Sequence, residues 1–291
     1  MTATTSLMPA AFIGQGSPMN TLEVNRYTSA WRHLGRTLPR PRAVLAVSAH
    51  WTTHGSAVTA MRRPRVIHDF YGFPQALFEV DYPAPGSPEV AQEVADVVRP
   101  GFVGLDHDSW GIDHGTWSVL AHVFPRADVP VVQLSLHAGA GLRYHLELGE
   151  RLAPLRERGI FILGSGNVVH NLRRIDWNRP DGAHAWGERF DADVKRLMTS
   201  APGDILAVEG HADYASSVPT TEHFLPLLYL AGLCQAAGQA AEVLVEGGTL
   251  GSITMTSYLL GCAGLAPAPP HADPAAALPD PGTVPPEQTN T

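Results

Sequence analysis

The chain has 291 residues, of which 44% are hydrophobic and 16% are charged. This composition excludes a disordered chain, and the length suffices for one large domain or two smaller ones. Twenty Lys and Arg against 28 Asp and Glu give a formal net charge of −8. We therefore predict no nucleic-acid partner, because neutralising phosphates requires a basic face. The 14 His residues are numerous beside 20 Lys and Arg, and metal binding is the first explanation to test.

The ends of the chain and its cysteines indicate where the protein works. Residues 1–11 carry neither a positive start nor a long apolar run, so no signal peptide is predicted. No stretch approaches the length needed to span a bilayer, and we expect no membrane partner. The two cysteines, Cys234 and Cys262, are too few for a disulfide scaffold. We expect a soluble, cytoplasmic protein, whose oligomeric state the sequence leaves open.

Composition divides the chain into three parts. Residues 1–9 form a short N-terminal extension, and residues 10–265 are predicted to be a single domain because no linker-like segment interrupts them. Residues 266–291 form a tail rich in Pro and Ala, with eight Pro among 26 residues and no aromatic side chain. Such a segment cannot bury enough surface to offset its loss of entropy, so we predict that it is disordered.

Within residues 10–265, short buried strands alternate with amphipathic helices. In chain order we predict a strand at 11–14, a strand at 43–49, a helix at 88–98, a strand at 130–135, a helix at 143–158, a strand at 160–165, and helices at 183–199 and 222–236. The strands are almost wholly apolar, as expected when both faces of a sheet are covered. The pattern predicts an α/β fold: a single domain with a central, mostly parallel sheet flanked by helices on both faces.

Polar residues follow three of these strands. In open α/β sheets, ligands bind outside the carboxyl ends of the strands. Gln15 follows the first strand, His50 and Trp51 follow the second, and His170 lies shortly after the strand at 160–165. One histidine at a strand end is usually a hydrogen-bonded structural residue. Two at neighbouring ends make a shared site a comparably good explanation.

Two further histidines stand at predicted helix starts. His114 lies in a segment rich in Gly and Trp before an apolar helix, where a cap region packed by two tryptophans is the better explanation from these residues alone. His223 follows Thr221 and Glu222, which suit the first turn of a helix. Glu222 is also explained by the helix dipole alone.

Other patterns carry less weight. His50 and His54 have the spacing of two ligands on a helix, but they follow a strand and precede Gly55. Ser165 stands between adjacent glycines, which is not the spacing of a hydrolase nucleophile elbow. No Cys-x-x-Cys pair exists to hold structural zinc. Residues 68–74 form an aromatic loop that either lines a flat pocket or packs on the sheet.

Six separated motifs together resemble a known family. They are FIGQGSPM at 12–19, VSAHW at 47–51, IHDFYGFP at 67–74, DHGTW at 113–117, GSGNVVHN at 164–171 and TEHFLPLL at 221–228. In this order they resemble the 4,5-DOPA extradiol dioxygenase family of class III ring-cleavage dioxygenases, which includes the protocatechuate 4,5-dioxygenase catalytic subunit. The resemblance covers roughly residues 10–258.

The resemblance implies a divalent metal site and its ligands. It implies that His50 and His223 hold the metal, together with the residue at position 15, and that His170 lies beside the metal as a ligand or as the acid/base. His114 is implied to face the substrate or the ligands. Iron(II) would support O₂ chemistry on a catechol, whereas zinc(II) at the same place would lack redox activity.

The chain departs from the family at one implied ligand, because Gln15 stands where the family has histidine. An amide oxygen can coordinate a metal, but it suits iron and zinc less well than imidazole. Three interpretations remain: Gln15 is a working ligand of lower affinity, a substitution that disables the site, or a sign of different chemistry.

Three functions compete on these residues. The first is a non-haem extradiol dioxygenase that cleaves a DOPA-like catechol with O₂, using Trp51, Phe70 and Tyr71 as the aromatic walls of the substrate pocket. The second is a non-redox or metal-poor binding protein for an aromatic metabolite on the same scaffold. The third, disfavoured by the elbow spacing, is a hydrolase that uses Ser165 with His170.

Overall fold

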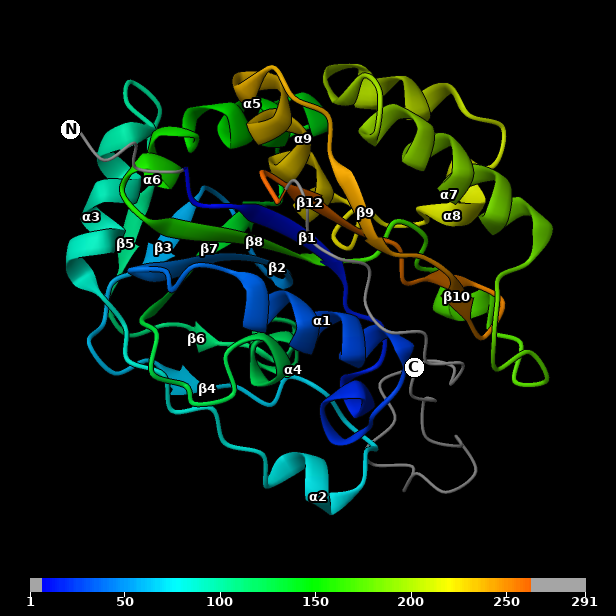
Figure 1. The fold of residues 1–291 in the computed structure, drawn as a ribbon, viewed down its shortest axis with the longest axis horizontal. Helices are drawn as coiled ribbons and strands as arrows, with labels where there is room; N and C mark the ends of the chain where they lie inside the picture. Colours follow the sequence, from blue (N-terminus) through cyan, green and yellow to red (C-terminus); the bar gives the residue numbers. More distant parts are fainter. Residues whose placement is uncertain (1–6, 263–291) are drawn as a thin grey trace.

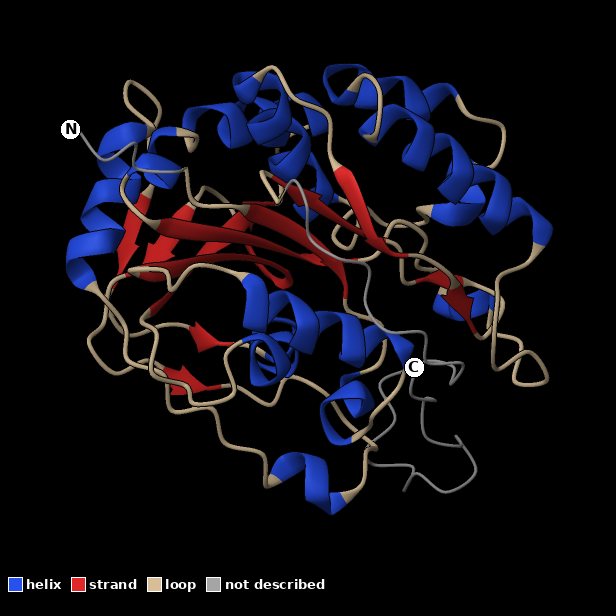
Figure 2. Ribbon diagram, in the orientation of Figure 1, coloured by secondary structure: helices blue, strands red, loops and turns tan. Residues whose placement is uncertain are grey.

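A computed structural model describes residues 7–262 and shows an eight-stranded sheet between two layers of helices (Figure 1, Figure 2). Across the sheet the strands are β5 (Gly104–Asp106), β3 (Ala57–Thr59), β7 (Val131–His137), β2 (Ala43–Thr53), β8 (Ile160–Gly166), β1 (Ala10–Gly14), β12 (Ser257–Leu260) and β9 (Glu242–Val245). Two small sheets pair β4 (Arg65–Val66) with β6 (Gly111–Ile112) and β10 (Gly248–Thr249) with β11 (Ile253–Thr254).

The centre of the sheet is parallel. Strands β7, β2, β8 and β1 run in the same direction, whereas β12 and β9 pair antiparallel beyond β1, and β3 pairs antiparallel with β7. The predicted α/β class, with a mostly parallel sheet in one domain, is confirmed. The four strands predicted from sequence are β1, β2, β7 and β8, which are these central parallel strands.

Alternate residues of the central strands pack on opposite helix layers. Phe12 and Leu45 belong to the core beneath α3 (Pro88–Val97), α5 (Leu142–Arg151), α7 (Ala185–Met198) and α9 (Leu225–Ala237). Ile13 and Val44 belong to the core against α1 (Arg26–Thr37) and α4 (His114–Val123). This alternation explains why the strands read as unbroken apolar runs, because both faces of the sheet are buried.

The predicted helices are present with changed ends. The predicted helix at 143–158 is interrupted and forms α5 and the short α6 (Pro154–Glu157), because a proline lacks the N–H that would continue the first helix. The predicted helix at 222–236 begins at Leu225, so His223 lies in the preceding turn. The remaining helical segments are α2 (Gln75–Phe78), α8 (Tyr214–Ser217) and the 3₁₀ turns η1 (Pro18–Leu22), η2 (Leu172–Arg174) and η3 (Pro202–Gly210).

Two irregularities position the polar residues near the sheet. Val47 of β2 pairs with Leu134 of β7, and Thr52 of β2 pairs with Leu136 of β7. The longer step on β2 means that β2 bulges between Val47 and Thr52. Bulges redirect side chains out of the regular pleat, and this one contains His50. The pairing of β4 with β6 brings the loop after Val66 beside the start of α4.

Within residues 7–262, no helix is long and apolar enough to cross a membrane. Both cysteines are free and buried. The predicted disordered tail lies wholly outside the described residues, as does most of the predicted N-terminal extension. These two boundaries and the cytoplasmic location therefore stay predictions.

Candidate functional site

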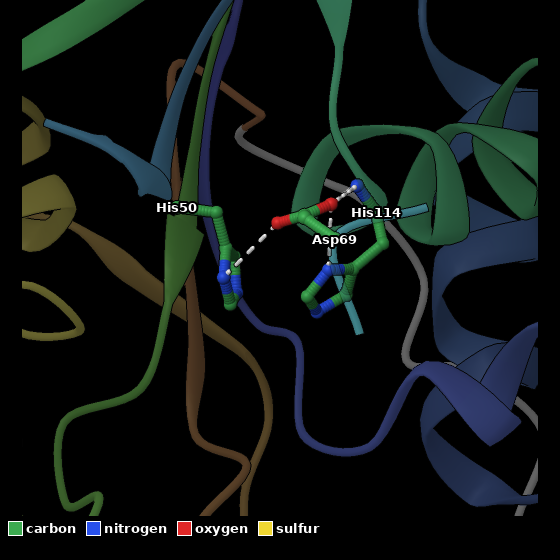
Figure 3. Close-up of side chains that lie close together, drawn as sticks. All are labelled: His50, Asp69 and His114. Atoms are coloured by element: carbon green, nitrogen blue, oxygen red, sulfur yellow. Dashed lines mark hydrogen bonds and ion pairs between the residues drawn. The ribbon is translucent and has the colours of Figure 1, made fainter. Parts of the chain in front are cut away.

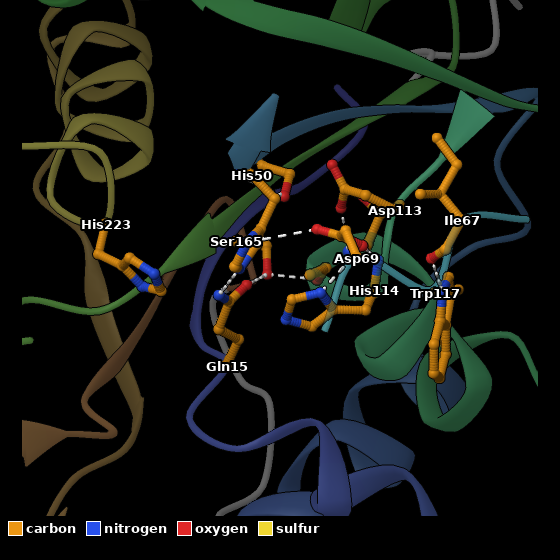
Figure 4. Close-up of polar contacts among 12 residues, drawn as sticks. Gln15, His50, Ile67, Asp69, Asp113, His114, Trp117, Ser165 and His223 are labelled. Carbon is orange, nitrogen blue, oxygen red and sulfur yellow. Dashed lines mark hydrogen bonds and ion pairs between the residues drawn. The ribbon is translucent and has the colours of Figure 1, made fainter. Parts of the chain in front are cut away.

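Gln15, His50 and Ser165 meet at the carboxyl ends of three neighbouring parallel strands (Figure 4). Gln15 directly follows β1, His50 lies in the β2 bulge, and Ser165 is in β8. The Nε2 atom of Gln15 lies 2.8 Å from Nε2 of His50, and Ser165 Oγ donates to Gln15 Oε1 over 2.7 Å. The structure therefore brings together Gln15 and His50, two of the residues that the sequence places directly after buried strands.

Asp69 lies between His50 and His114 (Figure 3). Its Oδ2 is 3.4 Å from Nδ1 of His50, and its Oδ1 is 3.0 Å from Nδ1 of His114. Oδ1 also accepts the backbone N–H of His114 over 2.9 Å. Asp69 thus faces the Nδ1 atom of both imidazoles. The ring centroids of His50 and His114 are 3.9 Å apart.

His223 and His170 form a second pair of rings beside His50. The ring centroids of His223 and His50 are 5.2 Å apart and the rings are nearly perpendicular, at 87°. His170 stacks on His223 with centroids 3.5 Å apart and planes 5° apart. The Nδ1 atom of His223 lies 3.2 Å from Oδ1 of Asn167, whose Nδ2 donates to the carbonyl of Thr254 over 2.8 Å. Because that donation fixes the amide of Asn167, Nδ1 of His223 is the donor and its Nε2 keeps the lone pair.

Glycines permit this close packing. A Cβ on Gly166 would lie 2.2 Å from the carbonyl oxygen of His223, and one on Gly164 would lie 2.7 Å from the carbonyl oxygen of Pro226. The two glycines around Ser165 therefore let the turn before α9 and the first turn of α9 approach β8. Gly115 has the same role, since its Cβ would lie 2.6 Å from Gln15 Oε1 and 2.7 Å from Cδ2 of His50.

Burial controls the charge of the site. Burial and the neighbouring histidines lower the pKa of both His50 and His223, and burial lowers the pKa of His170 to about 4. Burial acts to raise the pKa of Asp69, but the ring and the backbone N–H of His114, followed by His50, outweigh it and lower this pKa to about 2. The site at neutral pH therefore holds one carboxylate and three histidines favoured in the neutral form, which is the form that binds metals.

A second buried carboxylate supports the start of α4. Asp113 caps that helix by accepting the N–H of Thr116 over 3.1 Å, and Gln133 donates its amide to the other carboxylate oxygen. Burial, reinforced by the charge of Asp69, raises the pKa of Asp113 to about 6. The cap fixes the backbone of His114, which is the first residue of the helix, as the cap-region interpretation of this segment had it.

The predicted aromatic residues lie in different surroundings. Phe70 is buried and meets the ring of His114 edge-on, with centroids 5.4 Å apart. Trp51 is buried and stacks parallel to Trp110, with centroids 5.8 Å apart. Tyr71 is 60% exposed. Of the three, Phe70 is therefore the one in direct contact with a histidine of the site.

Asp69 and Asn167 are not candidates from the sequence alone. Asp69 lies in the motif at 67–74, next to Phe70, and Asn167 lies in the motif at 164–171, three residues before His170. What identifies them is their contact with Nδ1 of His50 and of His223, which depends on the tertiary structure.

Two arrangements could hold a metal ion here. On the Nδ1 side, ligand atoms of His50, Asp69 and His114 lie within 4.8 Å of one another. On the opposite side lie the Nε2 atoms of His50 and His223. In each ring the other nitrogen, Nδ1, faces an oxygen of Asp69 or Asn167. Metal-binding histidines usually donate their other ring N–H to a carboxylate or carbonyl oxygen, which is the arrangement of the second set.

Residues 9–261 match the family described as the catalytic LigB subunit of aromatic ring-opening dioxygenase. The chain belongs to this family. It is 46% identical over 258 residues to a 4,5-DOPA dioxygenase extradiol of Escherichia coli K12, covering 87% of this chain and 95% of that protein. It is 33% identical over 257 residues to a 4,5-DOPA dioxygenase extradiol of Beta vulgaris, covering 85% and 94%.

A solved structure supports the same assignment. The crystal structure of an uncharacterized Escherichia coli K12 protein superposes with a TM-score of 0.76 at 42% identity, covering 87% of this chain and 99% of the other. The resemblance inferred from the six motifs is thereby confirmed, and membership of a ring-opening dioxygenase family supports extradiol cleavage of a small aromatic substrate with O₂.

Proposed function

We propose that this protein is a non-haem, metal-dependent extradiol dioxygenase that opens the ring of a DOPA-like catechol with O₂. One observation carries the proposal beyond family membership. His50 and His223 each direct Nδ1 to an oxygen, of Asp69 and Asn167 respectively, and their rings lie 5.2 Å apart and nearly perpendicular. Two imidazoles that bind one ion through Nε2, each about 2 Å from it, require such a separation of the rings.

His50 and His223 would hold the metal through Nε2, with Gln15 and His170 beside it. The donor set fits a divalent transition metal, because imidazole suits iron and zinc and each ring is oriented from behind. Iron(II) held there would supply open positions for catechol and O₂ and a redox-active centre through which electrons pass from the catechol to O₂, whereas zinc(II) would occupy the same place without redox chemistry.

His170 and His114 would handle the protons of the catechol. His170 is next to the proposed ligand His223, and His114 shares Asp69 with the proposed ligand His50. Either ring would accept a proton from a catechol hydroxyl bound beside it and return that proton as the ring opens.

Trp51, Phe70 and Tyr71 remain the proposed aromatic contacts of the substrate. Phe70 has the best support because its ring meets His114, so a ring bound beside His114 would also contact Phe70. Tyr71 reaches into solvent and would contact only a part of the substrate that extends out of the site.

A metal-poor binding protein for an aromatic metabolite remains the second proposal, since the amide of Gln15 contacts Nε2 of His50 directly. The hydrolase proposal loses support, because the Ser165 hydroxyl is directed to Gln15 Oε1 and to the Gly115 carbonyl at 2.6 Å. A cytoplasmic location stays proposed on the strength of two buried free cysteines.

The test is anaerobic loading with iron(II), followed by L-DOPA and measurement of O₂ uptake and of the ring-opened product. Gln15→His and His223→Ala are measured alongside the unchanged protein. We expect stoichiometric O₂ uptake by the unchanged protein and by Gln15→His, and none by His223→Ala. If neither the unchanged protein nor Gln15→His takes up O₂ with L-DOPA or with simpler catechols, the proposal is contradicted and the binding protein is favoured.

A further inference from the structure

The Nε2 atom of His50 already has a hydrogen-bond partner within the chain. Because Nδ1 of His50 faces the Asp69 carboxylate at 3.4 Å, the ring proton belongs on Nδ1 and Nε2 carries the lone pair. The Nε2 amide group of Gln15 lies 2.8 Å from that lone pair and can only donate. Gln15 therefore occupies the same lone pair that a metal ion would need.

Contacts at both ends hold Gln15 in this position. Ser165 Oγ lies 2.7 Å from Oε1, which directs the amide nitrogen toward His50. The backbone N–H of Gln15 donates to the Gly166 carbonyl over 2.9 Å, and its carbonyl accepts Nδ2 of Asn20 over 3.1 Å. The residue is only 2% exposed. An ion cannot displace the amide simply by letting it turn into solvent.

Ser165 is itself fixed. Its single hydroxyl proton is shared between the Gly115 carbonyl oxygen, 2.6 Å away, and Gln15 Oε1, 2.7 Å away, and the side chain is wholly buried. The Cα of Gly115 also approaches closely, since a Cβ there would lie 2.6 Å from Gln15 Oε1. The contacts from Gly115 to Ser165 and from Ser165 to Gln15 thus hold the amide nitrogen of Gln15 beside His50.

We propose that Gln15 competes with the metal ion for Nε2 of His50, so that the amide lowers the affinity of the site instead of contributing a ligand. This inference rests on the metal position of the proposed function, at Nε2 of His50 and His223. It makes the opposite prediction from a ligand role, because removing a ligand weakens binding and removing a competitor strengthens it.

The test measures zinc(II) affinity by competition with a chromophoric chelator, which needs no ring-cleavage activity. Gln15→Leu deletes the amide, and Ser165→Ala deletes the group that holds it. Ser252→Ala is the matched control, because Ser252 is buried and its Oγ has no hydrogen-bond partner among residues 7–262. We expect zinc to bind about fivefold more tightly to Gln15→Leu, by the net strength of one hydrogen bond. Ser165→Ala should show a smaller gain in the same direction, and the control should not change.

The outcomes separate this inference from the proposed function. Weaker or unchanged zinc binding by Gln15→Leu, with binding by the original protein abolished in His50→Ala, would overturn the inference and leave the metal centre standing. If none of the variants binds zinc, the metal centre itself fails and the inference fails with it. Should Gln15→Leu not fold, as judged by circular dichroism, Ser165→Ala decides by the direction of its change.

Discussion

The imidazole rings of His170 and His223 stack face to face, with centroids 3.5 Å apart and planes only 5° apart. A nitrogen lone pair lies in the plane of its ring, and a bound ion stays about 2 Å from the nitrogen. One ion cannot lie in two parallel planes separated by the thickness of a ring. In this arrangement one ion would lie in the plane of only one of the two rings, and the contact of His223 with Asn167 is why the proposed function uses His223.

The first prediction follows from this stack. His223→Gln should lower zinc(II) affinity by about 100-fold or more, since replacing even an indirect supporting residue costs 10–100-fold. His170→Gln should change zinc affinity by less than about threefold and still abolish ring cleavage, because it removes a proton carrier. Chelator competition and O₂ uptake measure the two effects separately. Equal losses of zinc affinity in both variants would show that the stack opens to make His170 a ligand.

The second prediction concerns Asp69, which contacts Nδ1 of both His50 and His114. Asp69→Asn should weaken zinc binding by about 10–100-fold, the cost of losing a carboxylate behind a ligating imidazole. Asp176→Asn is the control, since Asp176 faces His184 at 3.8 Å elsewhere in the chain. Complete loss of zinc binding in Asp69→Asn, with His223→Gln unaffected, would instead place the ion among His50, Asp69 and His114.

The sequence predicted the parts of the site that depend on strand ends and motifs. The order of buried strands placed Gln15, His50 and His170 at one edge of a sheet, and the structure brings Gln15 and His50 to hydrogen-bonding distance. His114 and His223 needed the family motifs, because a helix start alone is explained equally well by capping. His223 lies in a turn before the helix, where propensity gives no signal.

What the sequence could not predict depends on long-range geometry. The bulge in β2 that contains His50 appears only in the register against β7. The contact of Asp69 with His114 depends on two residues of β4 pairing with β6, which is too short a signal to recognise. The contact of Ser165 with Gln15 likewise depends on the parallel pairing of β8 with β1.

The third prediction uses Gly115, at which any side chain would collide with the site. A Cβ would lie 2.6 Å from Gln15 Oε1 and 2.6 Å from Ser48 Oγ. Gly115→Ala should lower the free energy of unfolding by about 1–3 kcal/mol, the usual cost of overpacking, and should displace His50 enough to impair zinc binding. Gly55→Ala is the control, because nothing lies within 4 Å of its Cβ position. Denaturant unfolding checks the difference, and equal stability of the two variants would contradict the packing argument.

The last prediction is a pH dependence of stability that arises away from the proposed ligands. Burial lowers the pKa of His145 and of His122 from 6.5 to about 4. His145 is wholly buried with Nδ1 3.1 Å from the hydroxyl of Tyr229, and Nε2 of His122 lies 2.9 Å from the Asn20 carbonyl. Because the unfolded chain binds these protons more readily, the stabilisation is complete above about pH 6.5 and is lost as the pH falls toward 4.

A fully developed shift of this size corresponds to about 3 kcal/mol per histidine. Denaturant unfolding at intervals between pH 7 and pH 4 should therefore show stability falling with pH. His145→Gln can still accept from Tyr229 but cannot titrate, so its curve should be flatter over that interval. His33→Gln is the control, since His33 lies on α1 and is not fully buried. A His145→Gln curve parallel to that of the unchanged protein would show that His145 is not among the groups whose protonation drives unfolding.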